Sequence, residues 1–342
     1  MRYSKLLTGY TPYFTICIEK YNFMLMKKAT LVFIFLFSLI ATQAQLHWKR
    51  IDAFQIPLPT GLQLFYTNDS LEGKPNIAYY IEADLNNPDL IFDVDTTFNR
   101  RLTPTEFYKK NNAPIVIVNG TFFSFKTNQN LNTIIKNGKP LSYNISRAKG
   151  LGKDSAQVKM YRSALGIYEN RKADVAWIQS DTTLHLRASQ YPITPINENT
   201  FLPKKLKKYK RKRNKKFQPW DVETAIGGGP VLIQDGKINI TNNEELLFAG
   251  KGLYDKHPRT AMGYTANGKL IILVIQGRFS TIAEGANLLQ EATILQQLGC
   301  IEALNLDGGG SSCMLVNGKE TITPSDKTGQ RALPGVFIIR RK

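Results

Sequence analysis

Four two-residue turn signals constrain the fold of this chain more than any other feature. Each joins Asn or Asp to Gly, lies between two apolar runs and is followed by Lys: Asn137-Gly138, Asp235-Gly236, Asn267-Gly268 and Asn317-Gly318. Such pairs favour the left-handed backbone angles of tight β-hairpin turns. No fixed-period repeat accompanies them, which argues against a solenoid or a propeller. The pattern predicts a sheet-rich fold with much antiparallel pairing.

Two capping boxes and several short β-rich runs complete the predicted framework. Thr103 is placed to cap one helix with Pro104 at its first position, and Asn287 caps a second helix. Residues 261–306 read as strand, helix, strand, a crossover that favours parallel neighbours. The fold class is therefore α+β, with a mixed, largely antiparallel sheet and flanking helices. The remaining strands are expected at 62–67, 77–84, 90–95, 114–118, 160–167, 173–178 and 270–275.

Three regions are expected along the chain. Lys27 and Lys28 precede twelve nearly all apolar residues, 29–40, and small residues follow at Thr42 and Ala44. This is the layout of a cleavable secretory signal peptide, and it is too short to span a bilayer comfortably; an uncleaved anchor is the alternative. We therefore expect a leader at 1–44, a secreted or periplasmic mature chain without a transmembrane anchor, a β-rich N-terminal part at 45–110 and a single catalytic domain at 111–342.

The cysteines and histidines suggest no metal site and no cofactor. The three histidines lie far apart and no Cys-x-x-Cys motif is present. After loss of the leader, Cys300 and Cys313 remain. In an oxidising compartment they could form a disulfide, but two buried thiols acting as small apolar side chains is the favoured interpretation.

The net charge of +18 comes largely from one tract. Residues 204–216 contain ten basic and no acidic side chains, within a stretch at 180–220 that lacks periodicity and contains several prolines. We expect a basic surface loop or insertion there. Tyr209 is the only aromatic side chain in the tract, so the tract offers no stacking ladder for nucleic acid, and no specific nucleic-acid partner is expected. Contact with anionic envelope polymers through Lys204–Lys216 is the alternative to a solvated face.

Glycine-rich or arginine-bearing clusters lie at predicted strand ends, at 119–123, 226–230, 257–261 with 276–278, and 305–312. Tight turns and core aromatics would explain each one alone. If the strand ends meet, they form a cleft with open backbone N–H groups, two arginines and Asp307. Such groups suit a phosphate, and the carboxylate suits a cationic transition state at a sugar carbon. Nucleotide phosphate loops and the G-x-S-x-G elbow are missing, so Ser311 and Ser312 are poor nucleophile candidates.

The clusters also carry a family resemblance. The motifs NGTFF at 119–123, IGGGP at 226–230, HPRTA at 257–261 and NLDGGGSS at 305–312 come in the order seen in the phosphodiester glycosidase family. The resemblance covers roughly residues 110–340. It implies hydrolysis of the bond between an anomeric carbon and a phosphodiester oxygen, with α-N-acetylglucosamine as one candidate sugar. The alternatives are a non-catalytic protein that binds envelope glycans, or a phosphatase or nuclease, which would need a metal site.

The resemblance implies a role for each motif residue. Asp307 is the expected nucleophile or general base, Arg259 neutralises the phosphate, and His257 either shuttles a proton or serves as a structural hydrogen-bonder. Glu223 or Glu284 is the expected second carboxylate. A strong general acid is less necessary, because a phosphomonoester leaves readily. The expected substrate-binding residues are Asn119, Gly120, Thr121, Gly227, Gly228, Gly229, Thr260, Arg278, Glu284, Asn305, Gly308, Gly309, Gly310 and Ser311.

Three positions depart from the family pattern. Gln276 stands where the family often has Asp before Gly-Arg, and Gln290 stands where the helix often has Glu. The missing acid at 276 leaves open whether a catalytic or ion-binding carboxylate has been lost. Cys313 stands where Thr or a small residue is common, which bears on packing more than on chemistry.

Overall fold

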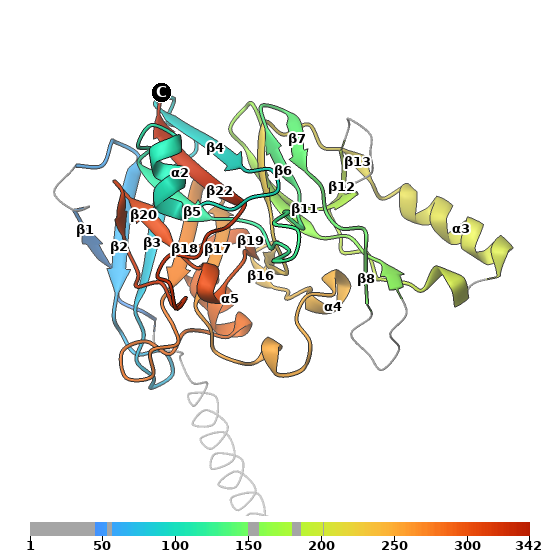
Figure 1. Cartoon of the computed structure of the whole chain (residues 1–342). Coiled ribbons are helices and arrows are strands. Elements are labelled where there is room, and N and C mark those ends of the chain that lie inside the picture. Colours follow the sequence, from blue (N-terminus) through green and yellow to red (C-terminus); the bar gives the residue numbers. More distant parts are fainter. Residues whose placement is uncertain (1–44, 53–56, 150–156, 180–185, 201) are drawn as a thin grey trace, which may run out of the picture. The chain divides into compact units, whose positions relative to one another are not determined.

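Antiparallel sheets dominate the chain (Figure 1). The computed structural model describes residues 45–52, 57–149, 157–179, 186–200 and 202–342. The predicted signal peptide lies outside these residues. From Leu46 to Lys342 the chain forms one compact unit, so the β-rich N-terminal part is not a separate body.

The largest sheet has eight strands in the order β1-β2-β3-β18-β17-β19-β15-β16. The N-terminal part enters this sheet because β3 pairs with β18 along seven residues. The strands are β1 (Lys49–Ile51), β2 (Leu62–Thr67), β3 (Ala78–Asp84), β15 (Val231–Gln234), β16 (Lys237–Ile238), β17 (Arg259–Thr265), β18 (Lys269–Ile275) and β19 (Cys300–Asn305).

Two further sheets and a small ribbon complete the strands. The seven-stranded sheet, in spatial order, contains β13 (Gln218–Pro219), β12 (Arg187–Ser189), β11 (Ala173–Gln179), β10 (Ser163–Ile167), β14 (Thr224–Gly227), β6 (Ile134–Lys136) and β7 (Lys139–Ser142). The five-stranded sheet contains β21 (Lys319–Glu320), β20 (Met314–Val316), β5 (Val116–Asn119), β22 (Gly335–Arg341) and β4 (Leu90–Thr96). The ribbon pairs β8 (Arg147–Lys149) with β9 (Gln157–Lys159).

All four predicted hairpins are present. They join β6 to β7, β15 to β16, β17 to β18 and β20 to β21. In three of them both turn residues have positive φ, for example 51° at Asn137 and 68° at Gly138. In the fourth only Gly268 has a positive φ, of 76°.

The helices confirm both predicted caps. In α2 (Pro104–Lys110), Thr103 and Glu106 form the capping box, and in α5 (Leu288–Gln297), Asn287 and Gln290 form the second. A short α4 (Asn242–Glu245) and three 3₁₀ turns, η1 (Glu198–Thr200), η2 (Gly250–Leu253) and η3 (Gly309–Ser311), lie in connections. No helix of the described residues is long and apolar enough to cross a membrane.

The prediction that two parallel strands would be neighbours was wrong, although the α+β class is confirmed. Every strand pair in the described part of the chain is antiparallel, including β17–β18 and β17–β19. Because β18 and β19 both run opposite to β17, they are parallel to each other but one strand apart. The crossover through α5 therefore connects parallel strands, as predicted, and β17 lies between them.

The basic tract was also predicted wrongly as a loop. Residues Pro203–Asn214 form helix α3, drawn at the right of Figure 1. Lysine and arginine have high helix propensity, and Pro203 occupies the first turn, where proline is tolerated. Arg213 is buried and pairs with Glu198, which fixes the end of the helix to the body.

The core lies between the sheets and beneath the helices. Leu270, Ile272 and Val274 of β18 face a core shared by all three sheets, while Ile271 and Leu273 face α5. This two-sided burial explains the continuous apolar run of β18. Cys300 and Cys313 are buried free thiols, so the disulfide alternative is wrong and the favoured interpretation is confirmed.

Candidate active site

Asn119 connects three of the four motifs at the end of β5. Its side chain is fully buried, and its Nδ2 donates to the backbone oxygen of Asp307 at 2.5 Å. Its Oδ1 accepts from Thr260 Oγ1 at 2.8 Å and from the backbone N–H of Cys313 at 3.0 Å. The predicted convergence of strand ends is therefore present around Asn119.

Asp307 follows β19 and is partly buried. Its backbone N–H donates to the oxygen of Gly120 at 3.0 Å. Burial raises the pKa of the Asp307 carboxyl to about 6, against the lowering influence of the Ser311 hydroxyl, the Arg331 charge and the Gly308 N–H. A carboxyl group with this pKa is ionised at neutral pH yet poorly solvated, which favours chemical reactivity.

Two arginines reach the glycine turn beside Asp307. A Cβ on Gly309 would lie 2.8 Å from Arg278 Nη2, and a Cβ on Gly310 would lie 2.6 Å from Arg331 Cζ. Gly309 also has φ of +62°, which a side chain would disfavour. The absence of side chains thus lets both guanidinium groups approach the turn.

Arg331 is a site residue that the sequence did not reveal. Asp326 holds its guanidinium through Nε and Nη2, both at 2.7 Å, and Nη1 donates to Ser311 Oγ at 3.3 Å. It precedes β22 in an irregular segment with no motif or periodicity. No sequence signal distinguished it from other surface arginines.

Arg259 lies at the start of β17. Its side chain is buried, Nε donates to Ala286 O at 2.8 Å, and Nη2 donates to Asp255 O at 3.2 Å. Burial lowers its pKa, which the nearby Glu291 charge partly opposes. These contacts fix the guanidinium beside the strand that carries Thr260, and its role in neutralising a phosphate stays a prediction.

His257 lies just before β17, and its backbone forms an isolated antiparallel bridge with Ala286. Burial lowers the pKa of its imidazole, and the positive charges of Arg259 and Arg278 lower it further. The negative charge of Asp255 partly opposes this shift. Its buried Nδ1 has no hydrogen-bond partner within the described residues. The backbone pairing supports the structural role, and the neutral ring retains the capacity to accept a proton.

The second glycine triplet does not provide the expected open N–H groups. The N–H of Gly227 donates to Thr133 O at 2.7 Å, that of Gly228 to Ser163 O at 3.1 Å, and that of Gly229 to Asn305 O at 2.7 Å. In return, Asn305 Nδ2 donates to Gly229 O at 2.8 Å. These glycines therefore allow close packing against β19 instead of forming a phosphate cradle.

Gly120 and Thr121 are likewise occupied. The N–H of Gly120 donates to Gly335 O at 3.2 Å, and Thr121 Oγ1 donates to Asn130 Oδ1 at 2.5 Å. Near Asp307, the N–H of Gly309 donates to Pro258 O at 2.8 Å. Side chains, and not a row of free amides, are thus the main polar groups of the site.

The two candidates for a second carboxylate lie in different places. Glu223 is exposed and lines a separate cavity of about 240 Å³ with Gly138 and Trp220, at the end of β14 opposite Gly227. The structure does not bring it to Asp307. Glu284 pairs with Lys74 at 3.5 Å and Lys256 at 3.9 Å, and its backbone oxygen accepts from the N–H of Arg278.

Two buried glutamates near the motifs, Glu245 and Glu291, were not predicted from the sequence. Glu245 accepts hydrogen bonds from Ser163, Val231 and Thr241 beneath Gly229. Both oxygens of Glu291 lack a partner within the described residues, and burial raises its pKa to about 8, opposed by Arg259. Glu291 lies three residues after Leu288 on the apolar face of α5, and an acid on that face was an available signal.

The two glutamines that depart from the family pattern have structural contacts. Gln276 Oε1 accepts from the N–H of Thr323 at 2.8 Å. Gln290 completes the cap of α5, and its Nε2 donates to Glu72 at 2.6 Å. Among the residues that the structure describes, no group of three or more His, Cys, Asp or Glu is arranged to hold a metal ion.

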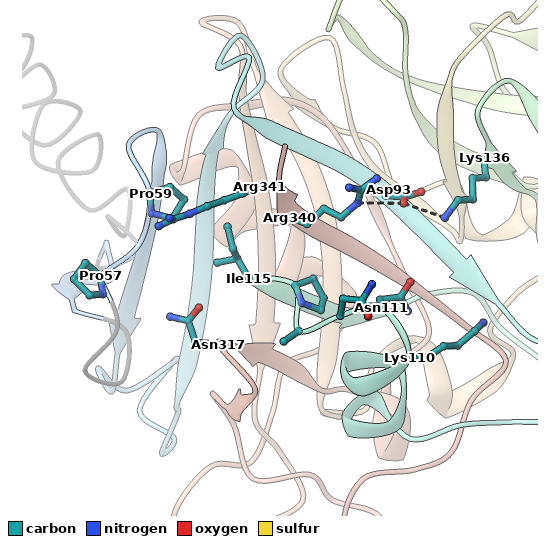
Figure 2. Close-up of a pocket in the computed structure, with 13 residues that line it drawn as sticks. Pro57, Pro59, Asp93, Lys110, Asn111, Ile115, Lys136, Asn317, Arg340 and Arg341 are labelled. Atoms are coloured by element: carbon teal, nitrogen blue, oxygen red, sulfur yellow. Dashed lines mark hydrogen bonds and ion pairs between the residues drawn. The ribbon is translucent and has the colours of Figure 1, made fainter.

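A separate basic pocket of about 630 Å³ contains none of the candidate residues. Figure 2 shows Lys136 and Arg340 directed toward Asp93, with Lys110 and Arg341 also lining the pocket. Asp93 lies 2.9 Å from Lys136 Nζ and 3.6 Å from Arg340 Nε. The acid already pairs with two of the cations, so we do not include this pocket in the site.

Fold and site together define a β-rich α+β protein in which a carboxylate and two arginines meet at converging strand ends. The family model for phosphodiester glycosidases matches residues 112–340, and the chain belongs to this family.

Curated relatives match over shorter stretches. Mouse N-acetylglucosamine-1-phosphodiester alpha-N-acetylglucosaminidase is 41% identical over 102 residues, which is 30% of this chain and 19% of that enzyme. The SPbeta prophage-derived uncharacterized protein YomE of Bacillus subtilis is 41% identical over 71 residues, 21% of this chain and 11% of that protein. The matched stretches thus cover less than a fifth of either relative.

Solved structures share the fold over most of the chain. A Synechocystis protein superposes with a TM-score of 0.58 at 15% identity, covering 86% of this chain and 64% of that one. The catalytic domain of zebrafish N-acetylglucosamine-1-phosphodiester alpha-N-acetylglucosaminidase gives 0.55 at 21% identity, covering 86% and 88%. At these identities the likeness establishes the fold alone.

Proposed function

We propose that the protein is a hydrolase of glycosyl-1-phosphodiesters and cleaves the bond between the anomeric carbon and the phosphate oxygen. The observation that carries the proposal is the turn that begins at Asp307, where the charge of Arg331 acts on the partly buried carboxyl and Arg278 approaches Gly309. Membership of the phosphodiester glycosidase family supports the same reaction.

Each group has a distinct task in this reaction. Ionised Asp307 attacks the anomeric carbon or activates water there, and it stabilises the positive charge that develops on the sugar. Arg278 and Arg331 neutralise the departing phosphate, which lowers its free energy in the transition state. Asn119 holds the backbone of Asp307, and Ser311 donates to its carboxylate.

The names of the mammalian relatives suggest α-N-acetylglucosamine as the sugar. The leader pattern at 1–44 suggests an exported protein that acts outside the cytoplasm. Both assignments belong to the proposal.

A substrate panel tests the reaction. The full chain is incubated with small glycosyl-1-phosphodiesters that differ in sugar and anomer, and the products are identified. Free sugar plus a phosphomonoester supports the proposal. Binding of all substrates without turnover would favour the alternative, a non-catalytic glycan-binding protein.

Arg331→Gln is expected to lower kcat/KM by about 10²-fold, because it removes one charge that stabilises the leaving phosphate. Arg331→Lys should recover only part of this loss, since an ammonium cannot form the same forked contacts with Asp326 and Ser311. Steady-state kinetics on the best panel substrate provide the measurement. The exposed Arg50→Gln on β1 is the charge-matched control and should retain wild-type rates. An Arg331→Gln enzyme as fast as the control would remove Arg331 from the site.

The pH dependence follows from Asp307. Because the reactive form is ionised and the pKa is about 6, kcat/KM should fall as the pH decreases through about 6. Stability should change in the opposite direction, since charging a buried carboxyl becomes costly as the pH rises through this value. Thermal stability should therefore decrease between about pH 4 and pH 6 more steeply in wild type than in Asp307→Asn. A shallower decrease caused by Glu291 should continue to about pH 8 in both proteins. A pH-independent kcat/KM between pH 5 and 7 (roughly one unit on either side of the pKa) would contradict this assignment.

A further inference from the structure

Helix α3 carries positive charge that the rest of the protein does not balance. Among the described residues, only Lys210 and Arg213 of α3 form ion pairs, both with Glu198. Six other basic side chains of the helix are exposed, and we call them the basic arm: Lys204, Lys205, Lys207, Lys208, Arg211 and Lys212.

The helix is locally unfavourable as an isolated unit. Lys204 and Lys208, Lys208 and Lys212, and Lys207 and Arg211 are like charges four residues apart, which repel one another on a helix. The first turn contains no acid and the N-cap makes no side-chain hydrogen bond, so the cations there also oppose the helix dipole. Anionic groups bound along the basic arm would relieve both effects.

The fixed end of α3 leads toward Asp307. The guanidinium of Arg213 lies 5.6 Å from the ring centre of Tyr161, and Lys159 Nζ lies 5.7 Å from the same ring. The next residue, Arg162, is buried, with an unpartnered Nε and its guanidinium 6.0 Å from the ring centre of Phe122. Phe122 follows Gly120 and Thr121 in the motif that holds Asp307. Lys159 and Arg162 thus continue the positive charge from α3 to the candidate active site.

The shape and composition of α3 favour a soluble linear polyanion over a lipid surface. The helix is 12 residues long, about 18 Å, and its charges recur about every 6 Å along one face. Apart from Pro203 at its first position, its only apolar side chains are Leu206 and Tyr209, and Arg213 lies over the ring of Tyr209. An interfacial membrane helix needs a broad apolar face, which α3 lacks.

We propose that the basic arm binds the repeating phosphates of a polymeric glycosyl phosphate and directs that chain to Asp307. This inference rests on the proposed function, because it identifies the substrate class of the same site. The polymer would contact the basic arm and then Lys159, with buried Arg162 adding positive charge beneath this path, and present one glycosyl–phosphate bond to Asp307. The bond broken and the products are those of the reaction proposed above.

Comparing a polymer with a small substrate tests the inference. The variant K204Q/K205Q/K207Q/K208Q neutralises four of the six side chains of the basic arm with good helix formers and keeps Lys210 and Arg213. The control K109Q/K139Q/K172Q/K237Q removes the same charge from exposed lysines elsewhere. The substrates are poly(N-acetylglucosamine-1-phosphate) and a single methyl phosphodiester of N-acetylglucosamine-1-phosphate.

The expected result is selective for the polymer. The basic-arm variant should raise KM for the polymer by about tenfold or more at low salt, with the small substrate unaffected and the control at wild-type values. The wild-type KM for the polymer should rise with salt more steeply than that of the variant. An equal KM for the polymer in variant and control would overturn the inference. The inference would also be overturned if the basic-arm variant lost binding to phosphatidylglycerol vesicles but bound the polymer as tightly as wild type.

A binding measurement separates this inference from the reaction itself. Fluorescence anisotropy of the labelled polymer with Asp307→Asn, with and without the basic-arm substitutions, requires no turnover. Tight binding that depends on the basic arm supports the inference. If wild type cleaves neither substrate, that result refutes only the proposed reaction. Binding that does not depend on the basic arm refutes the inference alone.

Discussion

Asp307→Asn is expected to lower kcat by about a thousandfold or more while the fold is retained. The amide has nearly the same shape as the carboxyl but supplies neither a nucleophile nor the negative charge that the developing sugar cation needs. Above pH 6 the variant should unfold at the same temperature as wild type or higher, because burial penalises the charged form of Asp307. Steady-state kinetics and thermal unfolding on the same preparations provide both values.

The control for this substitution is Asp235→Asn, which also replaces an acid beside glycine after a strand. Asp235 lies in the β15–β16 hairpin turn, and its φ of 51° is one that Asn tolerates well. It should retain wild-type kcat. Wild-type turnover in Asp307→Asn would exclude Asp307 from the chemical step.

Asn119→Ala is expected to impair both stability and activity. The substitution deletes three hydrogen bonds in a fully buried position and leaves the Cys313 N–H and the Asp307 backbone oxygen without their partner. Leaving such groups unsatisfied should cost about 3 kcal/mol or more in the free energy of unfolding. Activity should fall further than the loss of folded protein explains, because Asp307 loses its anchor.

Urea unfolding of Asn119→Ala, with kcat corrected for the folded fraction, measures the two effects separately. The exposed Asn239→Ala is the matched control, and its single hydrogen bond to Gln234 at the surface should matter little. A stability of Asn119→Ala within 1 kcal/mol or so of this control would contradict the role of Asn119 as the link among the motifs.

Local sequence chemistry predicted the elements whose signals lie within a few residues. Asn137-Gly138 and its three counterparts gave the hairpins because their turn geometry depends on the two residues themselves. The caps at Thr103 and Asn287 were found for the same reason. The neighbours of β19 were predicted wrongly, since whether a crossover places its strands side by side or one strand apart depends on long-range pairing.

The candidate site was predicted in outline and less well in its details. The motifs located Asp307, Asn119 and Arg278 because each lies at a strand end within a distinctive pattern. Arg331 was missed because its segment carries no pattern, and only the tertiary fold brings it beside Gly310. Glu223 was included for its charge alone, and the length of β14 separates it from Gly227. Which distant side chains come together can be predicted only once the tertiary fold is known.

The position of bond cleavage tests the proposed reaction most directly. Hydrolysis of a small glycosyl-1-phosphodiester in H₂¹⁸O, followed by mass spectrometry of both products, shows which atom water attacks. Attack at the anomeric carbon predicts ¹⁸O in the free sugar and an unlabelled phosphomonoester, with both products missing in Asp307→Asn. Label in the phosphate would show attack at phosphorus, and it would contradict the roles assigned here to Asp307, Arg278 and Arg331.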